Sequence, residues 1–535
     1  MRKIGPYILL AACALVLYLI VAFSMSITYD EDGHYSYGWK ILCDVPERTI
    51  SFWDSKMPIT ALNVLPHFAA EALLDWKRPS LNKISLEMIE HARVITVAAS
   101  IGLMALLMAW STRLWGRSAG LASGVLFCLS PNLMAHGTLV TTDLYMALAA
   151  TAVLYTHWRF AQTWRLRDAI IAAVALAIAQ ITKYSCLLLI PVAFLSLLPS
   201  LWFELRKKGT PGPWRVLSVH ALTTLVAAIL LINITFCCQG TFTPLRDYLF
   251  RTPEFQRLAQ IPVLSTLPLP LPVPYLDGID FTHHHEHTGE TFGNLYLLGE
   301  IRSRFDPYSK PFYSYYLVAY FFKEPIALQL LFLSALVFIG LNFNLQKFAC
   351  TEWFMVCPIL VYFIVQTISS REQIGLRHLL VIFPFMILIS SSQFREWAAF
   401  TKQKRLTYAA LLAWAAVSVF SYYPQMIPYM NEFVFNRLNA WKILADSNLT
   451  WGQSDDAMKE FLKANPDVKF NPRDPVSGRV LADVNAVSGV WRKHSMWLQR
   501  YEPIGHVGYM YLLYNIPPQP GQPEDLPVTP PVIKK

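Results

Sequence analysis

Charge is scarce in this sequence. Of its 535 residues, only 15% are Asp, Glu, Lys or Arg, whereas 54% are hydrophobic and 14% are aromatic. Soluble globular proteins usually carry about 25% charged residues. The composition therefore excludes an ordinary soluble domain and indicates a chain that lies in a lipid bilayer. Cysteine is scarce as well, and because none of the eight cysteines forms a CxxC pair, no disulfide framework is predicted.

Long apolar runs, in contrast, are abundant. A helix that crosses the hydrocarbon core needs about 20 mostly apolar residues, and residues 8–27 form such a run without a single charge. It is too long for the apolar core of a cleaved signal peptide and is interpreted as an anchor. The hydropathy pattern predicts an α-helical polytopic membrane protein of about eleven transmembrane helices. The predicted spans lie near 8–27, 92–110, 118–136, 143–160, 168–184, 186–203, 215–236, 323–342, 353–369, 376–393 and 406–424.

Positive charge is concentrated in alternate loops between these spans. Cytoplasmic loops normally carry an excess of Lys and Arg, which predicts a cytoplasmic N-terminus and an external C-terminal segment. It also explains the net charge of +9 without a nucleic-acid partner. The residues of the predicted cytoplasmic loops are Arg113, Arg117, Arg159, Arg165, Arg167, Arg206, Lys207, Lys208, Arg215, Lys347, Arg395, Lys402, Lys404 and Arg405.

Three segments outside the predicted spans face the same, external side. Residues 28–91 contain apolar positions at helical spacing, which indicates interfacial helices, and residues 237–312 form a second long loop. Residues 1–424 are therefore predicted to be one transmembrane module. Residues 425–515 are predicted to form a small α+β cap, and the proline-rich residues 516–535 a disordered tail.

Carboxylates stand at the external ends of two predicted spans. Asp30 and Glu31 follow the first span, and Asp143 opens the fourth. Acids at an interface are often solvated, and an acid in the first turn of a helix is favoured by the helix dipole. However, ionisable groups at the hydrocarbon boundary usually have a function. Since all three lie on one face of the membrane, we interpret them as candidate catalytic residues, with a general base among them.

Basic side chains on that face are candidate ligands for a phosphate. Lysines near span ends often only extend towards the interface, but a phosphate or diphosphate headgroup requires cations, and Arg suits bidentate contact. His34 and Tyr35 are predicted to shape the pocket beside them. The candidate cations are Lys56, Lys183, Lys323, Arg371 and Arg377.

A histidine cluster lies in the second external loop. His283, His285 and His287, with Glu290 beyond them, could hold a divalent metal. The alternative is a solvated loop, because His–His spacing alone is a weak signal. No nucleotide cofactor is expected.

The order of several short motifs resembles a known family. An acidic pair at 30–31 is followed by Lys56 and Pro58, by "TTD" ending at Asp143 and by "TKYS" at 182–185. The chain then contains "GNLYLLGE", "FYSYYLVAYFFKEP", "IGLRHLLVIFPF" and "DSNLTWGQSDD". This order resembles the phospholipid-carrier-dependent glycosyltransferases of the C-type superfamily, which include relatives of protein O-mannosyltransferases and of the lipid A aminoarabinose transferase.

The resemblance implies an inverting transferase of the plasma (inner) membrane, with its site on the external (periplasmic) face. The donor would be a polyprenyl-phosphate-linked sugar, and the acceptor a glycan, a lipid or a protein. By this resemblance Asp30 is the base with Glu31 assisting, Asp143 orients acceptor or metal, and Lys56 holds the lipid phosphate. The tail departs from the usual family pattern, because Thr450 and Ser454 stand where acids are common.

Two other functions stay open at this stage. A transporter or flippase of lipid-linked sugars would fit the membrane topology, although no internal repeat is visible and the acids gather at one face instead of mid-span. A non-catalytic relative would fit the family pattern, although Asp30, Glu31 and Asp143 are all present.

Overall fold

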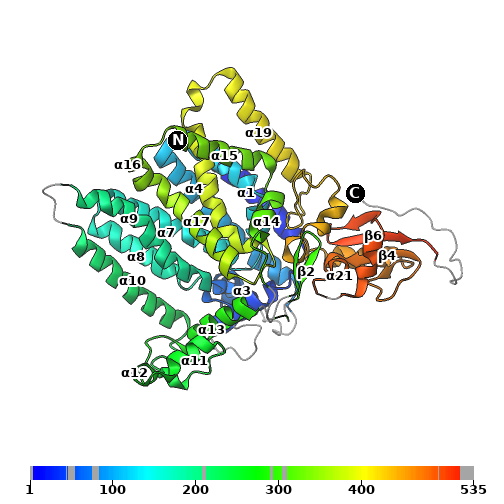
Figure 1. The fold of residues 1–535 in the computed structure, drawn as a ribbon, viewed down its shortest axis with the longest axis horizontal. Helices are drawn as coiled ribbons and strands as arrows, with labels where there is room; N and C mark the ends of the chain where they lie inside the picture. Colours follow the sequence, from blue (N-terminus) through cyan, green and yellow to red (C-terminus); the bar gives the residue numbers. More distant parts are fainter. Residues whose placement is uncertain are drawn as a thin grey trace.

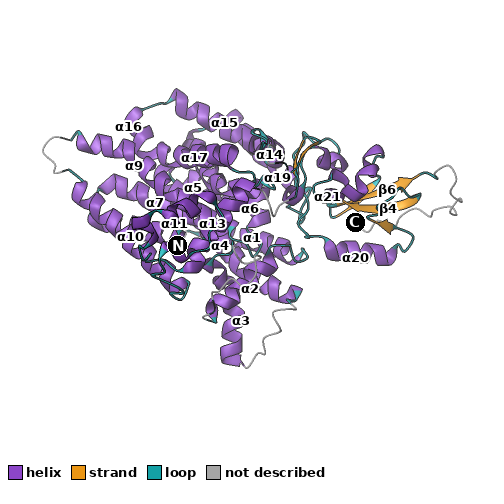
Figure 2. Cartoon of the chain, turned by 60° about the horizontal axis from the view of Figure 1, so that its bottom comes forward, coloured by secondary structure: helices purple, strands orange, loops and turns teal. Residues whose placement is uncertain are grey.

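The computed structural model describes residues 4–43, 45, 55–74, 84–207, 212–288, 293–303, 306, 310–491 and 493–518. Helices make up most of the molecule, and a C-terminal segment that carries the larger sheet lies at one end of the helical bundle (Figures 1 and 2). Glu290 and the predicted tail from residue 519 onwards lie outside the described residues.

The first half of the chain forms the centre of the bundle. Helix α4 begins at Ser85, whose side chain accepts a hydrogen bond from the Met88 amide, and it ends at Gly116, where a φ of 87° turns the chain into α5. Helix α8 packs between α7 and α10, while α4 contacts α1, α5 and α7. The helices are α1 (Gly5–Phe23), α2 (Glu31–Leu42), α3 (Ala61–Leu74), α4 (Leu86–Trp115), α5 (Arg117–Cys128), α6 (Pro131–His136), α7 (Asp143–Thr163), α8 (Leu166–Ala179), α9 (Leu189–Leu205) and α10 (Trp214–Thr235).

The middle of the chain contains three helices between residues 253 and 288, a two-stranded hairpin and the remaining helices of the bundle. The axis bends by 113° between α14 and α15, at the Glu324-Pro325 break. A 3-10 helix, Leu376–Ile382, leads into α18. The elements are α11 (Pro253–Gln260), α12 (Pro262–Ser265), α13 (Val273–Thr288), β1 (Leu295–Leu297), β2 (Glu300–Arg302), α14 (Tyr315–Lys323), α15 (Ile326–Leu341), α16 (Leu345–Lys347), α17 (Trp353–Ser369), α18 (Phe383–Ser391) and α19 (Lys402–Phe420).

The C-terminal segment contains a four-stranded sheet in the order β3-β4-β6-β5. Strands β4 and β6 pair antiparallel with Val480 opposite Tyr514, and both side chains are buried. Asp483 ends β4 and caps the next helix by accepting a hydrogen bond from the Asn485 amide, so residues 484–488 are helical and do not continue the strand. The elements are α20 (Asp455–Ala464), β3 (Lys469–Phe470), β4 (Gly478–Asp483), α21 (Val484–Ser488), β5 (Gly505–Val507) and β6 (Tyr511–Ile516).

Six helices of the described part of the chain are long and apolar enough to cross a membrane, and the bent pair α14–α15 would make a seventh. The count of about eleven spans is therefore not confirmed. Helices α5 and α8 contain only 12 and 14 residues, and α7 carries Asp143, His157 and Arg159 within its 21 residues. The part of the prediction that is confirmed is a mostly helical, membrane-embedded chain. Its orientation and the external placement of the C-terminal segment stay predictions.

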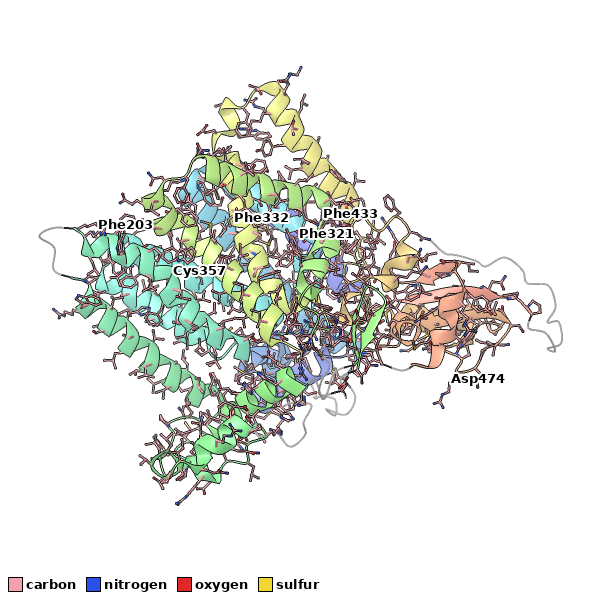
Figure 3. All side chains as sticks on the ribbon, viewed as in Figure 1. Phe203, Phe321, Phe332, Cys357, Phe433 and Asp474 are labelled. Atoms are coloured by element: carbon pink, nitrogen blue, oxygen red, sulfur yellow. The ribbon has the colours of Figure 1, made fainter. Side chains whose placement is uncertain are left out.

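The main apolar core continues across the predicted module boundary at residue 424. Ile427, Leu444 and Leu449 belong to the same buried cluster as residues of α4 and α18. Phe433 stacks on Phe321 of α14 with ring centroids 4.7 Å apart, and both rings are labelled in Figure 3. The start of the C-terminal segment is thus packed as part of the bundle.

Candidate active site

A cavity of about 900 Å³ lies where the helical bundle meets the C-terminal segment. Its walls come from the N-terminus of α2, the N-terminus of α7, the chain after α8, α13, the 3-10 helix after Gly375 and the C-terminal segment. Seven of the predicted site residues line it: Asp30, His34, Lys56, Asp143, Lys183, Arg377 and His285.

Arg377 links the two predicted catalytic acids. Its Nη1 lies 2.9 Å from Oδ2 of Asp30 and 3.8 Å from Oδ2 of Asp143, and Lys183 Nζ lies 2.6 Å from Oδ1 of Asp143. The Asp143 side chain is only 3% exposed, whereas the Asp30 side chain is 29% exposed. Asp30 is therefore the acid of this pair that a second molecule can reach.

Asp30 is fixed in place by its neighbour. Glu31 is fully buried, and its carboxylate forms an ion pair with the fully buried Arg93 at 2.6 Å. The same carboxylate accepts hydrogen bonds from the amides of Thr28 and Val140. Glu31 is not among the residues that line the cavity. It holds the start of α2 against α4 and the chain before α7, so its geometry gives it a positioning role instead of contact with a substrate.

Arg377 is positioned by the motif at 446–453. The Trp451 ring lies 4.0 Å from the guanidinium carbon, a cation–π contact. The Leu376 amide donates to the side chain of Asn448, and the Ser447 hydroxyl donates to the carbonyl of Ile374. A Cβ at Gly375 would clash with the Ser447 hydroxyl unless that hydroxyl moved, so glycine allows the close approach seen here. The two motifs therefore fold as one unit around the arginine.

The cavity is electrostatically polarised around Asp30. Burial alone would raise the pKa of Asp30, but Lys56, Arg377 and His34 hold it well below its usual range. Burial lowers the pKa of Lys56 although Asp30 opposes the effect, and burial together with Lys56 lowers the pKa of His34. The Asp30 carboxylate thus lies beside the cationic side chains of Lys56 and Arg377, whose charges favour its ionised form.

Three residues predicted to bind a phosphate or to shape the pocket do not line the cavity. Lys323 is buried and its ammonium donates to the carbonyls of Ile427 and Asn448. The Tyr35 hydroxyl forms a hydrogen bond with His67. The Arg371 amide donates to the carbonyl of Glu286, and its side chain is not among the lining residues. The structure thus brings together Lys56, Lys183 and Arg377, but not Lys323 or Arg371.

The histidine cluster is helical and extends the C-terminal end of α13. The rings of His283 and His287 stack with centroids 4.2 Å apart, and His285 packs on Phe281 and faces the cavity. No group of three or more His, Cys, Asp or Glu side chains arranged to hold a metal occurs in the part of the chain that the structure describes, which excludes Glu290. A metal bound by His283, His285, His287 and Glu290 stays a prediction.

The C-terminal segment contributes acids that sequence reasoning did not select. Burial raises the pKa of Asp446 to about 7 and that of Asp483 to about 6, and both line the cavity. Glu372, between two predicted spans, also lines it, and burial beside Glu286 raises its pKa to about 8. The conspicuous "DSN" and "DD" sequences at 446–448 and 455–456 were the available signal for Asp446 and Asp455.

The raised pKa of Asp446 predicts a pH-dependent difference between the natural protein and Asp446→Asn. A buried Asp with a raised pKa binds its proton more tightly in the folded state than in the unfolded state, where its pKa is about 3.9. The free energy of unfolding therefore falls as the pH rises from that value to the folded-state pKa of about 7. Asparagine is neutral throughout. Thermal unfolding between pH 5 and pH 8 should therefore show Asp446→Asn gaining stability relative to the natural protein as pH rises. A constant difference would contradict the assignment.

This arrangement can bind an anion and activate a hydroxyl. Three cations surround two carboxylates in a partly enclosed cavity, and an incoming phosphate would compete with Asp30 and Asp143 for Lys56, Lys183 and Arg377. A carboxylate released from its cation becomes a better base, because loss of the opposite charge raises its pKa. The site therefore suits a reaction in which a phosphate group is bound next to a hydroxyl that loses its proton.

The match with a known family covers the part of the chain that contains the "TTD" and "TKYS" motifs. Residues 75–232 match the family described as dolichyl-phosphate-mannose-protein mannosyltransferase. This match confirms the predicted family resemblance. It includes Arg93, Asp143 and Lys183 and ends before Arg377. No curated protein matches the sequence.

The solved structures that are similar to the chain include the following three, all at low sequence identity. ArnT from Cupriavidus metallidurans in the apo state is 13% identical, with 97% of this chain and 100% of that chain covered and a TM-score of 0.32. The same protein bound to undecaprenyl phosphate is also 13% identical, with 96% of this chain and 100% of that chain covered and a TM-score of 0.32. The Archaeoglobus fulgidus oligosaccharyltransferase in the apo form is 11% identical, with 77% of this chain and 54% of that chain covered and a TM-score of 0.44.

Proposed function

We propose that this chain is a membrane glycosyltransferase that moves a sugar from a polyprenyl-phosphate donor to an acceptor hydroxyl on the external face of the membrane. The observation that carries the proposal is the cavity in which Asp30, Asp143, Lys56, Lys183 and Arg377 meet. The family match supports it, since the description of that family names a lipid-phosphate-linked sugar and a sugar transfer.

The cations of the cavity are proposed to bind the donor phosphate. Arg377 offers a planar guanidinium already held by the Trp451 ring, and Lys56 and Lys183 flank it with ammonium groups. Fixed positive charge stabilises the negative charge that develops on the departing phosphate. Asp143 contacts Lys183 and Arg377 and is nearly unexposed, so it acts as a positioning residue for these two cations.

Asp30 is proposed to be the general base. Once the donor phosphate shares Arg377 and Lys56, the Asp30 carboxylate is freed to accept the proton of an acceptor hydroxyl. The hydroxyl oxygen then attacks the anomeric carbon, the carbon–oxygen bond to the phosphate breaks, and its electron pair leaves on polyprenyl phosphate. A single displacement of this kind inverts the anomeric configuration.

Reconstitution tests the proposal directly. The purified full-length chain in lipid vesicles, supplied with a radiolabelled polyprenyl-phosphate sugar and a panel of glycan, lipid and peptide acceptors, should release polyprenyl phosphate and form a glycoside with one acceptor class. Mass spectrometry of both products provides the measurement. Movement of intact donor between leaflets without cleavage would overturn the transferase in favour of a transporter, and neither cleavage nor movement would favour a non-catalytic relative.

A further inference from the structure

The end of the cavity formed by the C-terminal segment differs in chemistry from the end that holds Arg377. Its side chains include Asp446, Asp455 and Asp483, the amide of Asn485 and the rings of Phe470 and Trp491. None of the three aspartates forms an ion pair with Lys, Arg or His within the described residues. We call these six residues the acidic–aromatic wall.

The carboxylates of this wall are held by neutral donors. The Asn485 amide donates to Oδ1 of Asp483 at 2.7 Å, and the Tyr511 hydroxyl donates to Oδ1 of Asp455 at 2.7 Å. The Asp446 amide donates to the side-chain oxygen of Asn485 at 2.8 Å. The Thr450 hydroxyl also donates to Oδ2 of Asp483 at 3.5 Å, so the wall's carboxylate oxygens that accept no hydrogen bond among the described residues are Oδ2 of Asp446 and Oδ2 of Asp455.

Asp446 provides an independent sign of a missing partner. Its side chain lines the cavity although the residue is only 9% exposed. Its Oδ1 accepts a hydrogen bond from the Ser447 amide, but its Oδ2 is buried without a hydrogen-bond partner among the described residues. A buried acceptor without a donor costs free energy that a ligand hydroxyl or amine can recover.

Aromatic surface lies beside these acceptors. Trp491 and Phe470 both line the cavity, and they are 53% and 41% exposed. Phe470 packs edge-on against Tyr511 at 5.8 Å, which keeps one ring face available. Flat apolar faces next to convergent hydrogen-bonding groups are typical of ligand pockets, and here they match a ring with hydroxyls around its edge.

We propose that the acidic–aromatic wall binds a saccharide ring whose hydroxyls donate to Asp446, Asp455 and Asp483 while its apolar face packs on the aromatic rings. The role of this ring in transfer rests on the proposed function above. An anionic lipid headgroup would be repelled by the three carboxylates, and an acyl chain would leave their oxygens without donors. The ligand chemistry that fits is therefore a saccharide, carried by the acceptor or by the donor.

Binding to the intact chain tests this wall without any transfer reaction. The detergent-solubilised protein should bind at least one methyl glycoside of glucose, galactose or mannose saturably in isothermal titration calorimetry. Asp446→Asn retains the shape and the Ser447 contact but replaces an acceptor by a donor, and it should weaken binding by about ten-fold or more. Trp491→Ala, at a half-exposed position, should weaken binding without affecting folding.

A neighbouring acid provides the matched control. Asp456 lies next to Asp455 in the first turn of α20, pairs with Lys459 and does not line the cavity. Asp456→Asn should leave glycoside affinity within about two-fold of the natural protein, as expected for surface substitutions. Equal losses in Asp446→Asn and Asp456→Asn would overturn the proposal, as would saturable binding of Ser/Thr peptides or phospholipids with no binding of any glycoside.

Adding the donor to the same glycoside tests whether the bound saccharide is the acceptor or the donor sugar. A bound glycoside that becomes glycosylated identifies the wall as the acceptor site, whereas one that only competes with donor cleavage identifies it as the site of the donor sugar. Asp446-dependent binding in a protein that never cleaves donor would leave the wall standing and refute the transferase. Donor cleavage without glycoside binding would refute the wall alone.

Discussion

Asp30→Asn is expected to lower the rate of sugar transfer by about 10²–10⁴-fold, the contribution typical of a general base. The asparagine side chain retains the shape of Asp30 and an oxygen for Arg377, which now lies 2.9 Å from the carboxylate. It cannot accept a proton at neutral pH. Donor cleavage and glycoside formation by the purified protein are the measurement, and thermal unfolding verifies that the fold is retained.

Asp32 gives the control for this experiment. It lies two residues further along α2, is exposed and accepts a hydrogen bond from Ser36 at 3.1 Å. Asp32→Asn removes one carboxylate from the same helical turn without touching the cavity and should retain the natural rate. Full activity in Asp30→Asn, or an equal loss in both variants, would remove Asp30 from the reaction.

The second large effect is expected at Arg93, at the start of the predicted span 92–110 and near the N-terminal end of α4. Arg93→Met should reduce the free energy of unfolding by about 3–5 kcal/mol, because removing one partner leaves the other charge buried without compensation. Arg93 and Glu31 are both fully buried, and Arg93 also donates to the carbonyls of Ala22, Met25 and Ser26. Thermal unfolding in detergent and the yield of folded protein measure the loss.

A double variant separates structure from catalysis at this pair. Glu31→Gln added to Arg93→Met removes the orphaned charge and should recover part of the lost stability. Arg113→Met, at an exposed position in the last turn of the same helix, should change stability by no more than about 0.5 kcal/mol. A stable Arg93→Met, or a double variant less stable than Arg93→Met alone, would contradict the buried ion pair.

The sequence predicted the cationic half of the cavity because topology alone brings its residues to one face. Asp30, Asp143 and Arg377 each follow or begin a predicted span, and the hydropathy pattern predicts that these span ends lie on the same side of a bilayer. It did not separate Asp30 from Glu31. Both are acids in adjacent positions, and the difference arises only because α4 presents Arg93, 62 residues away along the chain, to one of them.

The acidic–aromatic wall was not predicted as part of the site because its residues come from local structures that have no strong periodic pattern. The valines at 480, 484, 487 and 490 favour a strand by propensity, but the Asp483 carboxylate accepts a hydrogen bond from the backbone amide of Asn485 and α21 begins there instead. Local capping thus overrode β-propensity. At 283–287 a helix forms where the sequence left a loop open. The histidine-rich residues continue α13, and the rings of His283 and His287 stack one helical turn apart.

Lys323 shows that the chain cannot be divided at residue 424. Its ammonium is buried at the bend between α14 and α15, and the two acceptors described for it are the carbonyls of Ile427 and Asn448. Asn431 likewise donates to the carbonyls of Phe321 and Glu324 at the same bend. In a truncated protein that ends before these residues, the buried Lys323 ammonium would lose both of these carbonyl acceptors. The helical part is therefore expected to fold correctly only when the C-terminal segment is part of the same chain.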